Sequence, residues 1–221
     1  LSAVATEQAK PTQRTMTVIK QLLDYCATQE DAIISYRASK MILAVHSDAG
    51  YCNEKKSRSR AGGHFFMSSD VPRPPNNGAI LTIAQIIKAV MSSAAEAKVG
   101  ALYINCREAV PARQTLEFLG HPQPPTPIQT DNTTALGVVN NNVMKKLKAM
   151  DMRFHWLRDR VNQKQFRHYW APGSDNKGDY VTKHHPPVHH EAMRSTFLTS
   201  IATLQALRKR VSNLLPAARV C

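Results

Sequence analysis

Three aspartates at strand and helix ends are the residues best suited to chemistry. Asp48 lies within the first predicted strand, Asp131 ends the fourth, and Asp179 opens a short helix after the fifth. Carboxylates at neighbouring ends of adjacent strands repel one another unless a cation neutralises them. Mg²⁺ fits such a cluster because it takes one or two carboxylates and keeps water and phosphate oxygens as further ligands. Two ions about 4 Å apart can activate a water and stabilise the leaving oxygen of a phosphodiester. Because Asp is also common at strand ends and helix caps, a structural role is the alternative.

The elements that must position these acids follow from the hydrophobic pattern. The predicted strands are 41–51, 62–67, 79–87, 128–130 and 166–171. The predicted helices between and after them are 92–119, with a Ser93-x-x-Glu96 capping box and an interruption at Pro111, then a helix capped by residues 131–133, a basic helix over 145–162, and a short helix near Asp179. A three-stranded meander followed by a strand reached through a helix predicts an α/β fold, with a mixed five-stranded sheet and flanking helices.

Helical segments flank this region on both sides. The spacing predicts a helix over 15–29 and one long amphipathic C-terminal helix over 190–215. The expected domains are a helical lead-in over 1–39, the sheet domain over 40–186 and a C-terminal extension over 187–221. The apolar stripe of the last helix comprises Met193, Phe197, Ile201, Leu204, Leu207, Val211 and Leu214. Such a stripe either packs on its own domain or docks into a protein partner.

Charge and composition indicate a polyanionic partner. The 221 residues are 43% hydrophobic, as in globular proteins, and carry a formal charge of +13. The longest apolar run, 79–91, is broken by Gln85 and Lys88, and the N-terminus lacks the pattern of a signal peptide, so we expect no membrane partner. Four scattered cysteines predict reduced thiols and an intracellular protein, cytoplasmic or nuclear, with an organelle still open.

The strongest local charge lies in residues 145–167, which hold eight basic and two acidic residues, a local charge of +6. One-sided cations of this kind supply the phosphate contacts that dominate nucleic-acid affinity, whereas the simpler alternative is a solvated helix face. The candidate nucleic-acid-binding residues are Lys145, Lys146, Lys148, Arg153, Arg158 and Arg160, together with Asn132 beside the second acid.

Five ordered motifs carry a resemblance to a known family. They are His46-Ser47-Asp48-Ala49-Gly50-Tyr51, residues 57–63 (SRSRAGG), residues 92–97 (SSAAEA), Gln129-Thr130-Asp131-Asn132 and Asp179-Tyr180-Val181-Thr182-Lys183. In this order they resemble the RNase H domain of copia-type retrotransposon Pol polyproteins, over roughly residues 40–185. The resemblance implies an RNase H-like fold and Mg²⁺-dependent hydrolysis of RNA in an RNA–DNA hybrid, with Mn²⁺ as an alternative ion. It places Asp48, Asp131 and Asp179 on the family's three catalytic, metal-binding Asp positions.

The family's fourth acid is where this sequence departs from the pattern. The family's catalytic Glu precedes a short apolar stretch, which here is 99–102, so Lys98 occupies that position. Glu96 matches an earlier, non-catalytic Glu and is the only nearby substitute, although two residues along a helix differ by about 200° in direction. An ammonium among the acids neutralises them and weakens metal occupancy. We therefore expect impaired hydrolysis.

Two functions remain open from the sequence. The first is a retrotransposon RNase H-like domain that binds RNA–DNA hybrid or a related nucleic acid and cleaves it poorly. The second is a catalytically dead, domesticated copy that serves as a structural or nucleic-acid-binding subunit of a larger assembly. Lys98, the net charge and the C-terminal helix suit the second function as well.

Overall fold

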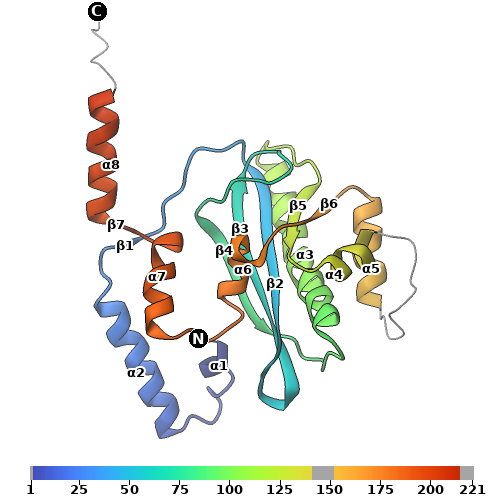
Figure 1. Ribbon diagram of the computed structural model, residues 1–221, viewed down its shortest axis with the longest axis horizontal. Coiled ribbons are helices and arrows are strands. Elements are labelled where there is room, and N and C mark those ends of the chain that lie inside the picture. The colour runs from blue at the N-terminus through green and yellow to red at the C-terminus, as the bar shows by residue number, and fades with distance from the viewer. Residues whose placement is uncertain (1, 141–151, 215–221) are drawn as a thin grey trace, which may run out of the picture. The chain divides into compact units, whose positions relative to one another are not determined.

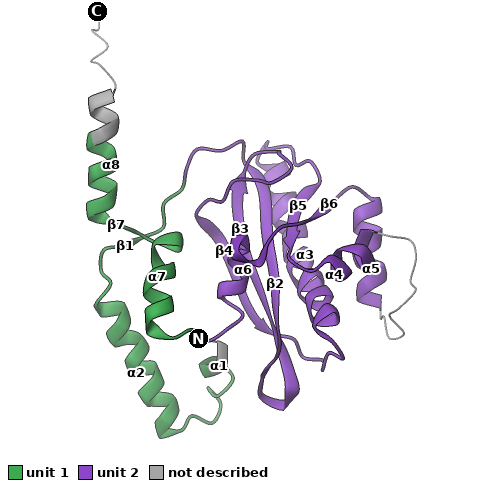
Figure 2. Cartoon of the chain, viewed as in Figure 1, with its two compact units in different colours: residues 1–36, 185–221 green, residues 37–184 purple. Residues whose placement is uncertain are grey.

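The computed structural model describes residues 2–140 and 152–214, and the chain divides into two units. Residues 37–184 form the sheet unit, and residues 1–36 with 185–221 form the helical unit, as Figure 2 shows in two colours. Every predicted acid and the residue Lys98 belong to the sheet unit.

The sheet unit contains a five-stranded mixed sheet, which confirms the predicted fold class. The strands, in spatial order, are β4 (Ala79–Ile86), β3 (Arg58–Ser68), β2 (Ile42–Glu54), β5 (Thr126–Thr130) and β6 (Phe166–Trp170). The pairs β2–β3 and β3–β4 are antiparallel, and a 3-10 turn over Lys55–Ser57 joins β2 to β3. The pairs β2–β5 and β5–β6 are parallel. The meander and the two parallel strands therefore meet at β2.

Strand β2 is central and is covered on both faces, which explains its first nine residues being buried. Leu43 and Val45 belong to the apolar core cluster, which also contains Leu102 of α3 (Ala94–Phe118). His46 pairs with His64 of β3, and the His64 imidazole in turn hydrogen-bonds to Asn76 in the loop before β4. One face of β2 thus packs on a helix and the other lies under polar loops.

The long helix α3 packs on β2 and β3 and continues through Pro111, so the predicted interruption is wrong (Figure 1). Proline removes one helical hydrogen bond, but tertiary contacts hold the last turns in place. The buried Arg113 guanidinium donates to Thr126 Oγ1 at 2.7 Å and to the Gln123 carbonyl at 2.9 Å. These bonds tie the end of α3 to the start of β5.

Shorter helices complete the sheet unit. They are α4 (Thr133–Asn140), α5 (Met152–Asn162), a 3-10 turn over Gly173–Asp175, and α6 (Lys177–Tyr180). Helix α5 buries Phe154 and Leu157. The first part of the predicted basic helix, residues 145–151, lies outside the described residues.

The helical unit contains α1 (Ser2–Ala5), α2 (Gln13–Ala27), α7 (Pro187–Phe197) and α8 (Ile201–Leu214). The prediction of one C-terminal helix over 190–215 is wrong, because the chain is extended at Leu198. There Thr199–Ser200 forms β7, which pairs with β1 (Ala32–Ile33). The strand pair gives the backbone at this point alternative hydrogen-bond partners, and the predicted apolar stripe is divided between α7 and α8.

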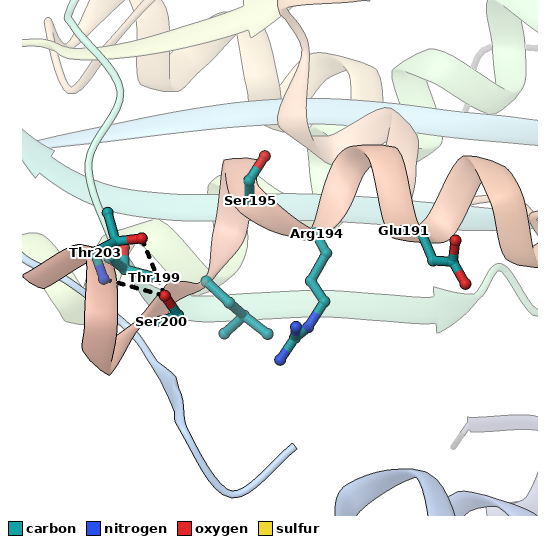
Figure 3. Close-up of a pocket in the computed structure, with 7 residues that line it drawn as sticks. Glu191, Arg194, Ser195, Thr199, Ser200 and Thr203 are labelled. Atoms are coloured by element: carbon teal, nitrogen blue, oxygen red, sulfur yellow. Dashed lines mark hydrogen bonds between the residues drawn. The ribbon is translucent and has the colours of Figure 1, made fainter. Parts of the chain in front are cut away.

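A pocket of about 290 Å³ lies at this break in the helical unit (Figure 3). Ser200 Oγ accepts a hydrogen bond from the Thr203 backbone N–H at 3.2 Å and lies 3.0 Å from the Thr203 hydroxyl. Glu191 and Arg194 supply its charged groups. The serine thus caps the start of α8.

Across residues 2–140 and 152–214, every helix is too short or too polar to cross a lipid bilayer.

Two buried histidines predict acid sensitivity of the fold. Burial lowers the pKa of His46 to about 3 and that of His168 to about 4. Between pH 6.5 and about 4 the unfolded chain binds protons that the folded chain excludes, so stability falls as pH falls. The slope is roughly 1.4 kcal/mol per pH unit for each such histidine. Urea unfolding at several pH values measures it.

We expect His168→Gln to flatten this pH dependence and the exposed-site control His155→Gln to retain it. Identical pH profiles for the His168→Gln chain and the unaltered chain would contradict the assignment.

Candidate active site

Asp48 and Asp131 are brought together by the pairing of β2 with β5. In this parallel pair His46 stands opposite Gln129, and each aspartate lies two residues further along the chain. Asp48 is 1% exposed and Asp131 follows the last residue of β5. The sequence predicts that these two acids lie close together, and this register brings them to the same end of the strand pair.

Lys98 reaches both acids from the second turn of α3. Its Nζ donates to Asp48 Oδ1 in a short hydrogen bond and to Asp131 Oδ1 at 2.6 Å. The lysine side chain is 14% exposed and that of Asp131 is 22% exposed, so the cluster is only partly screened by water. The ammonium stands between the two carboxylates.

The protonated form of Lys98 is favoured in this setting. Burial opposes the charge, but the negative charge of Asp48 and the hydrogen bonds to Asp131 and Asp48 outweigh it and raise the pKa of Lys98. A group with a raised pKa contributes stability that persists below its ordinary pKa and is lost only as pH rises through the folded value. The Lys98 side chain therefore carries its positive charge at neutral pH.

Thr182 completes the surroundings of Asp48. Its hydroxyl lies 3.0 Å from Asp48 Oδ2 and 2.7 Å from the Asp179 carbonyl oxygen. Both carboxylate oxygens of Asp48 thus have protein partners. The sequence reasoning assigned Thr182 to a motif without giving it a contact.

Asp179 contributes its backbone rather than its carboxylate to this cluster. The carboxylate forms an ion pair with Lys183, four residues further on, in a short contact. Asn176 places the segment, because its amide donates to the Ser47 carbonyl at 2.9 Å and its Oδ1 accepts from the Gly178 N–H at 3.0 Å. Asn176 is a favoured helix-capping residue, so the sequence does contain a signal for the start of α6 before Asp179.

Gly178 lets α6 approach β2 closely. A Cβ at this position would lie 2.9 Å from the His46 carbonyl oxygen and 3.2 Å from the Asp48 nitrogen. A side chain here would displace α6 and with it Thr182.

Glu96 stands apart from the aspartates. Its carboxylate accepts a hydrogen bond from the Ser92 N–H at 2.6 Å and another from the Ser92 hydroxyl. The Ser93 hydroxyl accepts from the Glu96 N–H at 3.1 Å, as the capping role predicts. Glu96 thus serves the start of α3, and its carboxylate has its partners there.

The donor set around Asp48 does not fit a divalent ion as it is folded. In the part of the chain that the structure describes, no three His, Cys, Asp or Glu side chains form a group able to hold a metal ion. Oxygen atoms of Asp48 and Asp131 that Mg²⁺ would need are hydrogen-bonded to the Lys98 ammonium. An ammonium stands where a cation would bind.

The candidate nucleic-acid-binding residues are only partly described. Lys145, Lys146 and Lys148 lie outside the described residues. Arg153, Arg158 and Arg160 lie on α5, all half-buried.

Aromatic rings support two of these arginines. The Arg158 guanidinium lies 5.5 Å from the centre of the Phe154 ring, and that of Arg160 lies 5.1 Å from the centre of the Trp156 ring. Asn132 Oδ1 accepts from the Ala135 N–H at 2.7 Å, so it caps α4. These rings hold two cations in place on α5.

The strand order β4-β3-β2-β5-β6, with a long helix between the meander and the first parallel strand, defines an RNase H-like domain. No family model matches the chain. The chain is 24% identical over 166 residues to the retrovirus-related Pol polyprotein from transposon TNT 1-94 of Nicotiana tabacum. The match covers 75% of this chain and 12% of that polyprotein. Together with the strand order, this match supports an RNase H-like domain that is similar to part of a retrotransposon Pol polyprotein.

Solved RNase H structures are similar to this chain only at low identity and low TM-score. The N-terminal RNase H domain of a Mycobacterium tuberculosis protein is 15% identical, with a TM-score of 0.40 over 64% of this chain and 91% of that chain. An RNase H1 isolated from compost by a metagenomic approach is 10% identical, with a TM-score of 0.48 over 64% of this chain and 92% of that chain. At such scores the fold assignment rests on the strand order.

Removal of the lysine tests the ion-pair cluster. We expect Lys98→Met to lower the free energy of unfolding by about 3 kcal/mol, because it leaves two neighbouring carboxylates without their cation. Urea unfolding at pH 7 measures the change.

The matched control is Lys183→Met, whose lysine forms an exposed ion pair with Asp179 and contributes at most about 1 kcal/mol. Equal effects of the two substitutions would contradict the special role of Lys98.

Proposed function

We propose that this chain is the RNase H-like domain of a copia-type retrotransposon Pol polyprotein, that it binds RNA–DNA hybrid, and that its hydrolysis of the RNA strand is impaired. The observation that carries the proposal is the Lys98 ammonium hydrogen-bonded to both Asp48 and Asp131. Mg²⁺, or Mn²⁺ in its place, would have to displace a cation that is covalently part of the protein. The proposed site of action is inside the cell, in the cytoplasm, the nucleus or an organelle.

Charge repulsion explains why hydrolysis suffers. A divalent ion next to the ammonium meets like charge at short range, and each unit pair at 4 Å costs about 4 kcal/mol at an effective dielectric near 20. The lysine also donates hydrogen bonds to carboxylate oxygens of Asp48 and Asp131 that a metal ion would need as ligands. Asp179, paired with Lys183, and Glu96, bound to Ser92, would each have to change partners to contribute.

Hybrid binding does not depend on this site. The chain carries a net charge of +13, and α5 presents arginines supported by aromatic rings. Phosphate contacts from such residues supply affinity without reading sequence. The basic residues at 145–148 extend the same charged stretch along the chain.

A second candidate function is a catalytically dead, domesticated subunit of a larger assembly. It is favoured by the complete set of protein partners around Asp48 and by exposed apolar side chains in the helical unit. Those side chains include Leu23 at 61% exposed and Val188 at 78% exposed. Leu207 on α8, at 49% exposed, is where we propose a protein partner could dock.

Restoring the acid tests the proposed cause of impairment. We expect the unaltered chain to cleave a labelled RNA–DNA hybrid at a barely detectable rate with Mg²⁺ or Mn²⁺. Lys98→Glu should raise the rate at least about 100-fold, a gain of roughly 2.7 kcal/mol in transition-state stabilisation. Adding Asp131→Asn to the Lys98→Glu chain should abolish the gain.

A Lys98→Gln chain separates loss of the ammonium from gain of the carboxylate. Efficient cleavage by the unaltered chain that Asp131→Asn abolishes would overturn the impairment. Inactivity of the folded Lys98→Glu chain would favour the dead subunit.

Hybrid binding has its own test. We expect the affinity for hybrid to fall steeply with salt, and the triple change of Arg153, Arg158 and Arg160 to Gln to lower the slope of log K against log salt by about 2–3. Fluorescence anisotropy with a labelled hybrid measures both quantities.

The control substitution is Lys88→Gln, at an exposed lysine outside α5. An unchanged slope in the triple variant would place the phosphate contacts elsewhere.

A further inference from the structure

A second polar site lies on the sheet, built from three residues at one level of three adjacent strands. His46 of β2 stands opposite Gln129 of β5, which stands opposite Tyr169 of β6. All three line a cavity of about 260 Å³. None of them is a predicted site residue, and none contacts Lys98.

Gln129 has a buried donor without a partner. The residue is 2% exposed, and its Nε2 finds no hydrogen-bond acceptor in the described part of the chain. Its Oε1 accepts a long hydrogen bond from the Tyr169 hydroxyl at 3.5 Å. An amide donor buried without a partner costs about 1–3 kcal/mol. Gln129 lines the cavity, so a bound acceptor that reaches its amide would remove this cost.

His46 adds a second donor. Its Nδ1 accepts from the Lys177 backbone N–H at 3.2 Å, which requires an unprotonated Nδ1. In a neutral imidazole whose Nδ1 is an acceptor, Nε2 carries the proton. Two of the residues that line the cavity, His46 and Gln129, therefore carry uncharged donors.

The rim of the cavity is cationic. Arg73 and Lys177 line it together with one acid, Asp175, which leaves a net charge of +1. Burial raises the pKa of the Tyr169 phenol to about 12, and the positive charges of Arg167 and Arg73 partly oppose that rise. Pro74 and the Tyr169 ring add apolar surface.

The loop that carries Arg73 and Pro74 is held in place. Arg167 of β6 donates to the Pro72 carbonyl at 3.0 Å and to the Val71 carbonyl in a shorter contact. At the other end of the loop, Asn76 Oδ1 is hydrogen-bonded to His64 Nε2 at 2.9 Å, and the Ser68 hydroxyl donates to the Pro75 carbonyl at 2.7 Å. The wall of the cavity is thus preformed.

We propose that this cavity binds a phosphate monoester, whose oxygens accept from Gln129 Nε2 and His46 Nε2 while Arg73 and Lys177 neutralise its charge. A phosphate brings acceptors and negative charge together, which matches these donors and a cationic rim. The remaining volume beside Pro74 and Tyr169 accommodates part of the group that carries the phosphate. The site shares no residue with the Lys98 cluster or with the proposed hybrid contacts on α5.

Thermal unfolding of the full chain with inorganic phosphate or adenosine 5′-monophosphate tests the site at constant ionic strength. We expect either ligand to raise the Tm of the unaltered chain in a saturable way. Gln129→Leu should raise the Tm of the ligand-free chain, because it removes the unpartnered donor, and should abolish the ligand-induced shift. Lys177→Gln should weaken binding about tenfold.

Lys88→Gln is the matched control, because it removes the same charge from an exposed lysine outside the cavity, and we expect it to bind as the unaltered chain does. Equal affinity for both ligands assigns the site to the phosphate group alone, and tighter binding of the nucleotide assigns it to a phosphate carried on a nucleoside. Absence of any shift, a full shift in the Gln129→Leu chain, or equal weakening by Lys88→Gln would overturn the proposal.

Discussion

The hydrogen bonds of the Lys98 ammonium with Asp48 and Asp131 are the constraint on which the rest of this site depends. Two neighbouring carboxylates on adjacent parallel strands repel each other unless a cation lies between them. In this chain the cation is supplied by α3. The ion pairs of Lys98 therefore connect α3 to β2 and to the residue that follows β5. Without them, two acids would face each other at this point.

The surroundings of the ammonium reinforce this arrangement. The Thr182 hydroxyl lies within hydrogen-bonding distance of the second oxygen of Asp48, and Asn176 with Gly178 holds α6 against β2. The Asp179 carbonyl oxygen accepts a hydrogen bond from the Thr182 hydroxyl, and the Asp179 carboxylate forms an ion pair with Lys183. The sheet has the strand order of an RNase H-like domain, and its three aspartates form ion pairs with lysines of the same chain. The result is consistent with a nucleic-acid-binding role that does not require turnover.

The sheet was predictable from sequence because apolar runs bounded by polar turns mark the strands locally, and a strand reached through a helix pairs in parallel. The meeting of Asp48 with Asp131 follows from that order. The pairing of Asp179 with Lys183 is a local contact between residues four apart, but the motif assigned Asp179 to the metal site instead. The break at 198–200 was also missed, since its cause is pairing with a segment more than 160 residues away. Pro111 was misread because Arg113 anchors the helix by tertiary contacts that no local rule contains.

The most direct test of the central claim is to observe the Lys98 ammonium by nitrogen-15 NMR while Mg²⁺ is added at pH 7, with Lys98→Gln used to assign the signal. The account predicts a protected ammonium signal that Mg²⁺ leaves unchanged at millimolar concentrations, because the ion cannot displace a cation bonded to both acids. Loss or shift of that signal at sub-millimolar Mg²⁺, with saturation, would show that the metal takes the site and would contradict the account.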